Sequence, residues 1–212
     1  QTPGARRKNP EREVGPDILE TALGLLGKDE QDAIRLIVCE GKSYQHAAEA
    51  LGVHQLHAFD LGDYPLEMTR DDKDRLVDVM RDVQPSFMLS HSQYDPYNTD
   101  HMLTTQIVLE CRSTAQAWGH NPGQKVLGAP QLYLFEPHQT EQMGWKPDTF
   151  LDITPVWEKK RAAIECMEGQ EHLWEFYTRV AQNRANHFTR NSGGQGGGRA
   201  CLYAEGFQSI FP

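Results

Sequence analysis

Apolar residues recur along the middle of the chain with the spacings of alternating strands and helices. A strand is predicted over Leu56–Leu61 by its short apolar segment. The sequence Thr69-Arg70-Asp71-Asp72 has the form of a capping box, so a helix is expected to begin there. Its apolar positions lie three or four residues apart on one face: Leu76, Val79, Met80 and Val83. A strand followed by an amphipathic helix is typical of a β-α-β unit.

The spacing of apolar residues predicts further elements toward the C-terminus. Strands are expected over Ser86–Ser90, Gln131–Glu136 and Thr149–Ile153. Between the first two, a helix is expected to open at Asp100-His101, with an apolar residue at every fourth position: Leu103, Ile107, Cys111 and Ala115. We therefore predict the α/β fold class, with a Rossmann-like layered and parallel sheet and flanking helices.

The C-terminal part combines a long helical pattern with a glycine-rich segment. A helix should begin at Thr154-Pro155 and be interrupted near Gly169. Beyond the interruption, an apolar stripe is expected to pack in the core, with a dimer surface as the alternative: Leu173, Phe176, Tyr177 and Val180. Asn191–Gly198 is predicted to be a flexible connector, and a mobile lid is the alternative.

The N-terminal segment has a different pattern. Gln1–Pro10 is a basic tail that contains proline, and Asp17–Leu26 and Asp29–Val38 carry apolar residues at helical spacing. We therefore divide the chain into a helical segment over residues 1–48, whose role the sequence does not indicate, and an α/β domain over residues 49–212.

Composition narrows the classes of protein that need to be considered. The formal net charge of −9 and a pI of about 5.4 argue against a nucleic-acid partner. The four cysteines lie far apart, which predicts reduced thiols rather than disulfides or a zinc ribbon. No apolar run is long enough for a bilayer and no signal core precedes the domain, so we expect a cytoplasmic protein without a membrane partner.

Candidate chemistry is concentrated in the loop His91–His101, which follows the strand predicted to end at Ser90. Ligands of open α/β sheets bind beyond the carboxyl ends of the strands. His101 is the clearest candidate for a metal ligand. Further ligands, or groups that support the ligand, could be His91, Asp95 and Asp100. A catalytic zinc needs about three protein ligands, so others must come from elsewhere. The alternative is structural: Asp95 starts a turn and Asp100 caps the helix.

Several segments resemble the LmbE-like, or PIG-L, family of metal-dependent enzymes. They are Phe59–Leu66, Asp95–His101, Leu134–Gln139, Arg161–Met167 and Gln170–Trp174. The resemblance covers residues 49 to 212 and is greater for the branch of hydratases that act on ring-cleavage products of aromatic acids. Deacetylases of this family tend to carry a histidine two residues after the loop aspartate, where this chain has Tyr97.

The resemblance implies a zinc-dependent lyase that adds water to a carbon-carbon double bond of an unsaturated oxo-tricarboxylate. It implies that His101 is a metal ligand and that His138 is the catalytic acid or base. A bound metal lowers the pKa of water, and a histidine that titrates near neutrality can transfer protons. The partner is then a small tricarboxylate, and a homo-oligomer is left open.

The N-terminal segment departs from the family pattern. Family members begin with a strand and an Ala-His-Pro-Asp-Asp-like motif that supplies two metal ligands, and this chain has no such motif. Leu26–Val53 instead resembles the first part of the helix-turn-helix in region four of RNA polymerase sigma factors. The sequence therefore keeps two alternatives beside the hydratase: an inactive truncated or rearranged hydratase-like protein, and a metal-dependent N-deacetylase of the PIG-L family.

Overall fold

The strands form two sheets, only one of which is parallel throughout. The computed structural model describes residues 35–37, 52–53, 55–59, 61, 66–165, 171–191 and 200–210. A two-stranded parallel sheet joins β1 (Arg35–Ile37) to β2 (Leu56–Ala58). The larger sheet contains β3 (Phe87–Ser90), β4 (Gln131–Phe135), β5 (Thr149–Asp152) and β6 (Ala204–Ser209) in the order β3-β4-β6-β5. The predicted α/β class is confirmed.

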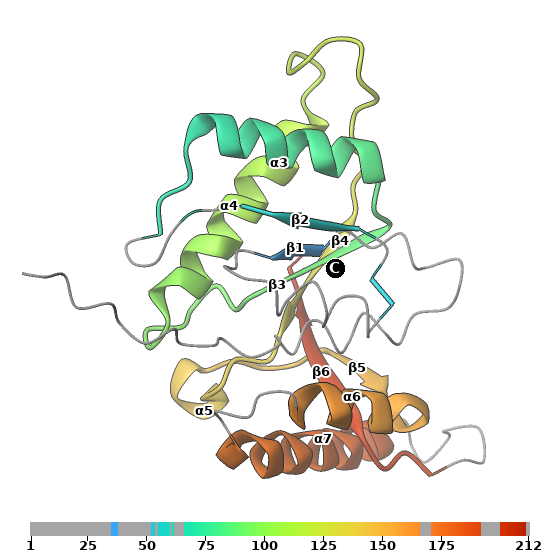
Figure 1. Cartoon of the computed structure of the whole chain (residues 1–212). Helices are drawn as coiled ribbons and strands as arrows, with labels where there is room; N and C mark the ends of the chain where they lie inside the picture. Colours follow the sequence, from blue (N-terminus) through green and yellow to red (C-terminus); the bar gives the residue numbers. More distant parts are fainter. Residues whose placement is uncertain are drawn as a thin grey trace, which may run out of the picture.

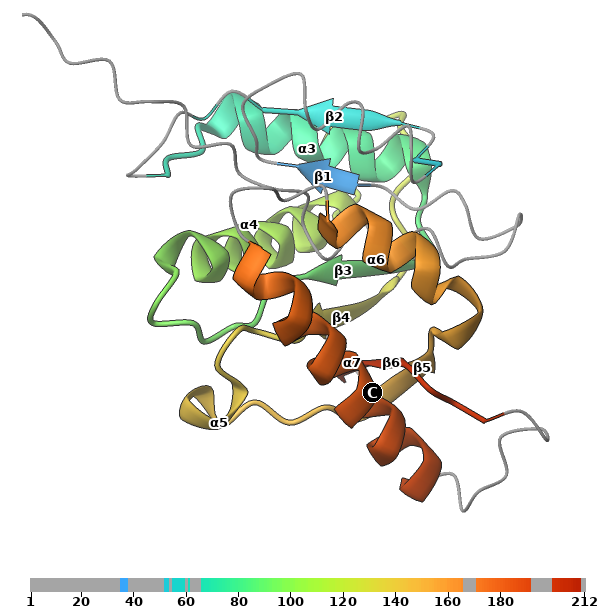
Figure 2. The ribbon, with the colours of Figure 1, turned by 60° about the horizontal axis from the view of Figure 1, so that its bottom comes forward.

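The helices gather at opposite ends of the molecule (Figure 1). At one end, α3 (Arg70–Val83) packs on α4 (Thr99–Gln116), which also contacts β3. At the other end, α6 (Trp157–Glu165) follows the 3-10 turn Thr154–Val156 and packs on α7 (Glu171–Asn191). In Figure 2, α7 crosses in front of β5 and β6, with which it is in contact. The short α5 (Thr140–Met143) follows β4.

The expected capping box is present at the start of α3. The Thr69 hydroxyl accepts a hydrogen bond from the backbone N–H of Asp72, and the Asp72 carboxylate accepts one from the backbone N–H of Thr69. The predicted apolar faces of α3 and α4 meet in the largest core cluster, which contains Phe59, Leu76, Val77, Met80, Ile107, Cys111, Ala115 and Leu127. Local capping and helical periodicity therefore determine this half of the fold.

The expected parallel arrangement holds for only part of the larger sheet. β3 and β4 are parallel, but β6 pairs antiparallel with both β4 and β5. The last strand lies between its two partners because α7 carries the chain back across the sheet. Strand direction is set by such long-range pairing, which hydrophobic periodicity does not encode.

Two predictions for individual segments also need correction. Arg35–Ile37 forms β1, although the helical spacing of Asp29–Val38 predicted a helix, because pairing with β2 overrides local propensity. The stripe on α7 is not core: Phe176 is 37% exposed, and the buried positions are Ala181, Arg184 and Ala185.

Several predictions fall outside the described residues. They concern the tail Gln1–Pro10, the helical pattern Asp17–Leu26, the interruption near Gly169 and all but the first residue of the segment Asn191–Gly198. Asn191 itself ends α7. The division of the chain at residue 49 remains a prediction.

Candidate active site at the carboxyl edge of β3 and β4

The two predicted site loops leave the sheet side by side. β3 and β4 are parallel neighbours, with Ser90 opposite Leu134, so the loops that follow them emerge at the same edge. His91 directly follows β3, and its ring lies edge-on to Phe135, the last residue of β4, with 4.5 Å between ring centroids. Sheet topology thus brings the His91–His101 loop and the His138 loop together.

Asp95 is the buried centre of the first loop. Its side chain is 1% exposed, and its carboxylate accepts hydrogen bonds from the backbone N–H groups of Tyr97 and Asn98 at 3.2 and 3.1 Å. The Asn98 amide donates to both carboxylate oxygens. Burial on its own raises the pKa of Asp95, but the hydrogen bonds from Asn98 and His101 outweigh it and hold the pKa below its usual value. Asp95 is therefore ionised at neutral pH.

His101 is oriented by this carboxylate. Its Nδ1 lies 2.9 Å from Oδ2 of Asp95, and its side chain is 33% exposed. A carboxylate that accepts a hydrogen bond from Nδ1–H keeps the proton on Nδ1 and leaves Nε2 without one and available to a metal, the arrangement found around metal-bound histidines. Asp95 has all its hydrogen bonds within the loop, so it fits the role of a supporting carboxylate better than that of a ligand.

The ring of His91 packs face to face with the ring of His101. The two imidazoles stack with centroids 3.9 Å apart and planes inclined by 17°. A metal lies close to the plane of each imidazole that binds it, at about 2.0–2.1 Å from nitrogen. Two rings stacked in this way are poorly placed to bind one ion together, so the geometry favours a supporting role for His91, which stays a prediction.

Asp100 lies in the first turn of α4, where an acidic side chain interacts favourably with the helix dipole. It is not the N-cap, as the structural alternative expected. Asn98 occupies that position, and its side chain bonds to Asp95 instead of capping the helix. A role for Asp100 as a metal ligand stays a prediction.

His138 faces the first loop from the segment after β4. Its Nδ1 is 3.2 Å from the Tyr177 hydroxyl, and its ring stacks on Phe176 with 4.7 Å between centroids. Burial lowers the pKa of His138 below its usual value, and His172 acts in the same direction, whereas Asp95 opposes both. The influence of Asp95 places the two loops within electrostatic reach of each other. Spacing predicts Phe176 and Tyr177 only as apolar positions, because it does not indicate which residues a helix face contacts.

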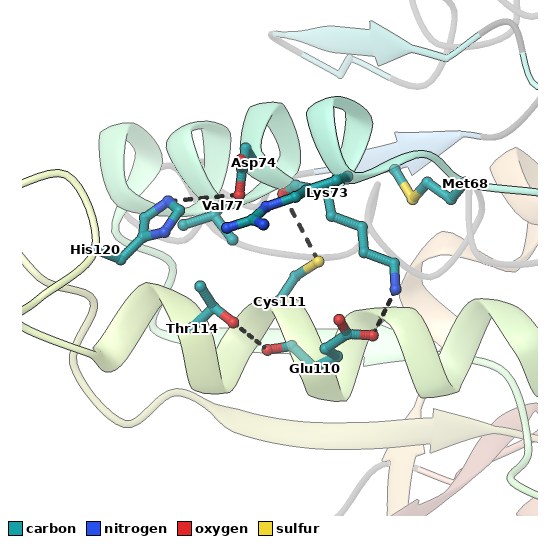
Figure 3. Close-up of a pocket in the computed structure, with 9 residues that line it drawn as sticks. Met68, Lys73, Asp74, Val77, Glu110, Cys111, Thr114 and His120 are labelled. Atoms are coloured by element: carbon teal, nitrogen blue, oxygen red, sulfur yellow. Dashed lines mark hydrogen bonds and ion pairs between the residues drawn. The ribbon is translucent and has the colours of Figure 1, made fainter.

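A separate cavity of about 430 Å³ lies between α3 and α4, and none of the predicted site residues lines it (Figure 3). Four of the lining side chains lie in two close pairs. Lys73 is 2.7 Å from Glu110, and His120 is 3.9 Å from Asp74. Burial raises the pKa of the Cys111 thiol to about 12, so this cysteine is not a thiolate nucleophile at neutral pH. The candidate site therefore stays at the sheet edge.

The model of the PIG-L family, described as GlcNAc-PI de-N-acetylase, matches residues 24–112. The solved structure of GalB, the 4-carboxy-2-hydroxymuconate hydratase from Pseudomonas putida KT2440, is 46% identical and superposes with a TM-score of 0.79, covering 91% of this chain and 90% of that one. The chain therefore belongs to the PIG-L family.

Two curated relatives extend the comparison. A 4-oxalmesaconate hydratase of Pseudomonas putida is 57% identical over 166 residues, which cover 78% of this chain and 64% of the relative. A diacetylchitobiose deacetylase of Thermococcus kodakarensis is 29% identical over 174 residues, covering 78% and 60%. The chain thus spans less than two thirds of the length of these curated relatives. The family match begins at residue 24, and the resemblance of Leu26–Val53 to a sigma-factor segment gains no support.

Proposed function

We propose that this protein is a hydro-lyase that adds water to 4-oxalomesaconate, as part of the 4,5-cleavage degradation of protocatechuate or gallate. The observation that carries the proposal is the 57% identity to a 4-oxalmesaconate hydratase, against 29% to a deacetylase. Tyr97, at the position where the deacetylases tend to carry a histidine, favours the same choice. The substrate is a small tricarboxylate. A cytoplasmic location and a homo-oligomer remain predictions.

The metal proposed for the site is zinc, with His101 as a ligand through Nε2. The described residues fit only this part of a site, since none of their His, Cys, Asp and Glu side chains form a group of three that could hold a metal. The remaining ligands would come from outside the described part of the chain. A metal bound there lowers the pKa of a water molecule and polarises a substrate oxygen. Asp95 and His91 keep the His101 ring in one orientation through the bond at Nδ1 and the stacking contact.

His138 is proposed to transfer the proton. Hydration places the hydroxyl of water on one carbon of the double bond and a proton on the other. With Nδ1 held by the Tyr177 hydroxyl, Nε2 is the ring nitrogen left to exchange a proton with water or substrate. A lowered pKa keeps the ring neutral at pH 7, ready to accept that proton.

The first experiment is elemental analysis of the purified chain for zinc, together with hydration of 4-oxalomesaconate followed by its ultraviolet absorbance. We expect about one zinc per chain and hydration that is lost after chelation and restored by zinc. Release of acetate from an N-acetylglucosamine substrate would favour the deacetylase instead. If the purified chain contains no zinc and shows no hydration, it is a hydratase-like protein without activity.

A further inference from the structure

A group of buried charges lies where β4 and β6 meet α6 and α7. Four charged side chains there are largely enclosed: Glu136, Lys160, Arg184 and Glu205. They form two ion pairs, Lys160 with Glu205 and Arg184 with Glu136. Buried ion pairs seldom add net stability, because removing two charges from water offsets most of their attraction. Their presence calls for another explanation.

Arg184 and Glu136 are joined by two hydrogen bonds. Nε of Arg184 donates to one carboxylate oxygen at 2.7 Å, and Nη2 donates to the other at 2.5 Å. The side chains are only 10% and 17% exposed. A bidentate contact between a planar guanidinium and a carboxylate fixes direction as well as distance.

Further contacts hold the guanidinium of Arg184 in place. Nη1 of Arg184 donates to Nδ1 of His187 at 3.0 Å, and the guanidinium carbon lies 5.6 Å from the centre of the Trp145 ring. Gly206 on β6 leaves room for the arginine stem, since a Cβ at that position would lie 3.3 Å from Arg184 Cδ and 3.1 Å from Pro147 Cβ. These contacts restrict the position of the Arg184 guanidinium, which in turn binds the Glu136 carboxylate.

Glu136 belongs to the segment that carries the proposed catalytic histidine. It follows β4 directly and lies two residues before His138, and α5 begins at Thr140. On α7, Tyr177 and Arg184 are seven residues apart, two turns along one face. Tyr177 contacts the His138 ring, while Arg184 contacts the start of the same segment. One helix therefore holds this short segment at two places.

We propose that Arg184 is a positioning residue: its bidentate bond to Glu136 fixes the segment between β4 and α5, and with it the imidazole of His138. This inference rests on the proposed hydratase function. A displacement of about 1 Å at a reacting group can reduce the rate by about 100-fold. The ion pair therefore acts on catalysis without touching the substrate.

The test replaces the arginine and separates turnover from binding. In Arg184→Gln, kcat should fall at least about 10-fold, while KM and the zinc content stay close to those of the unaltered protein. Compared with Arg184→Gln, Arg184→Lys should recover part of kcat, because lysine keeps the positive charge but cannot form the bidentate contact. An unchanged kcat in Arg184→Gln overturns the proposal.

Lys160→Met is the matched control. It also leaves a buried carboxylate, Glu205, without its cation. Lys160 acts on Glu136 through its charge, but the two hydrogen bonds from Arg184 to Glu136 stay in place in this variant. It should lower the Tm about as much as Arg184→Gln and leave kcat unchanged. If kcat instead falls in both variants in proportion to the loss of Tm, the role of Arg184 is only structural.

A second readout is independent of hydration. Amide hydrogen exchange, followed by mass spectrometry, should accelerate over residues 136–144 in Arg184→Gln but not in Lys160→Met. If the unaltered protein shows no hydration, the proposed function fails, while the exchange data still decide whether Arg184 anchors the segment. Should Arg184→Gln fail to fold, Glu136→Gln replaces it: the amide keeps the shape but weakens the bond, so the same loss of kcat and faster exchange are expected, and their absence overturns the proposal.

Discussion

At the scale of single residues, Asp95 orients its neighbours in the candidate site through hydrogen bonds. It is enclosed by the loop that it belongs to, and it stays ionised because Asn98 and His101 direct hydrogen bonds at its carboxylate. The consequence for His101 is a fixed ring and a fixed tautomer. His138 has a different kind of support, from the aromatic residues Phe176 and Tyr177 of α7.

Replacement of the carboxylate by an amide tests this arrangement. In Asp95→Asn, an amide N–H facing Nδ1 of His101 would shift the ring proton to Nε2 and block that nitrogen as a ligand. We expect zinc affinity to fall about 10- to 100-fold, as is usual when the partner of a metal-bound histidine is lost. Zinc titration with a competing chelator measures it. Asp71→Asn, in the exposed first turn of α3 and outside the loop, is the control and should bind zinc normally.

The two histidines should separate metal binding from turnover. His101→Ala should lose the metal, whereas His138→Ala should keep it and lose about 100-fold or more in kcat, a usual contribution of general acid-base catalysis. Elemental analysis and the hydration assay on the same samples distinguish the two effects. Retained zinc in His101→Ala would refute the ligand assignment.

The pH dependence of catalysis should report on His138. Its pKa is lowered, chiefly by burial, so the neutral ring persists below the usual histidine range. If the neutral form is the base, kcat/KM should be constant through neutral pH and fall as the pH drops through a value below about 6.5. A rate profile between pH 4 and 9 tests this. In Tyr177→Phe, which keeps the aromatic packing but removes the hydroxyl, the acidic limb of the profile should move.

At the scale of elements, the candidate site is built from residues at the ends of strands and helices. The site loops begin where β3 and β4 end, and α4 begins where the Asp95 loop closes. Arg81, buried on α3, donates hydrogen bonds to the carbonyl groups of Ala115 and Ala117 at the end of α4. These contacts hold α3 and α4 together, and α4 in turn contacts β3.

The capping box of α3 provides a test of element stability that is separate from catalysis. Thr69→Ala removes the acceptor for the Asp72 N–H. The free energy of unfolding should fall by about 1 kcal/mol, because one N–H of the first turn loses its partner. Urea denaturation measures the loss. At a temperature where the variant is fully folded, its activity should be unchanged. A loss of activity there would mean that the start of α3 affects the site.

At the scale of the whole molecule, β4 is the strand that joins the two ends. It pairs with β3, whose loop carries His101, and with β6, which is held by α7. The two halves of the site are thus supported by different helices, and they are joined by this sheet and by a hydrogen bond from the Tyr97 hydroxyl to the Gln142 side chain. Within the described residues, no helix has the length and apolarity that crossing a bilayer requires.

Metal binding should therefore stabilise the molecule as a unit. A ligand that binds only the folded state adds about 2.7 kcal/mol when present at 100 times its Kd, which corresponds to a rise in Tm of about 5–10 °C for a chain of this size. Thermal unfolding with and without zinc measures the shift. His101→Ala should show no shift, and an equal shift in that variant would place the metal elsewhere.

Local patterns in the sequence were sufficient to predict the elements around the candidate site. Capping and periodicity predicted α3, the strands β3, β4 and β5 to within a residue or so, and the loop with His91, Asp95 and His101. Each of these features depends on neighbours a few residues away. Family resemblance added His138, whose role no local pattern indicates and which still awaits its test.

Only the tertiary structure decided how these pieces meet. The antiparallel insertion of β6, the strand at Arg35–Ile37, and the contacts of Tyr177 with His138 and of Arg184 with Glu136 join residues far apart in the chain. Period and composition give each segment an apolar face but not its partner, because that choice depends on the packing of the whole chain. The sequence by itself therefore determined the elements and their candidate chemistry, and the fold decided which side chains face one another.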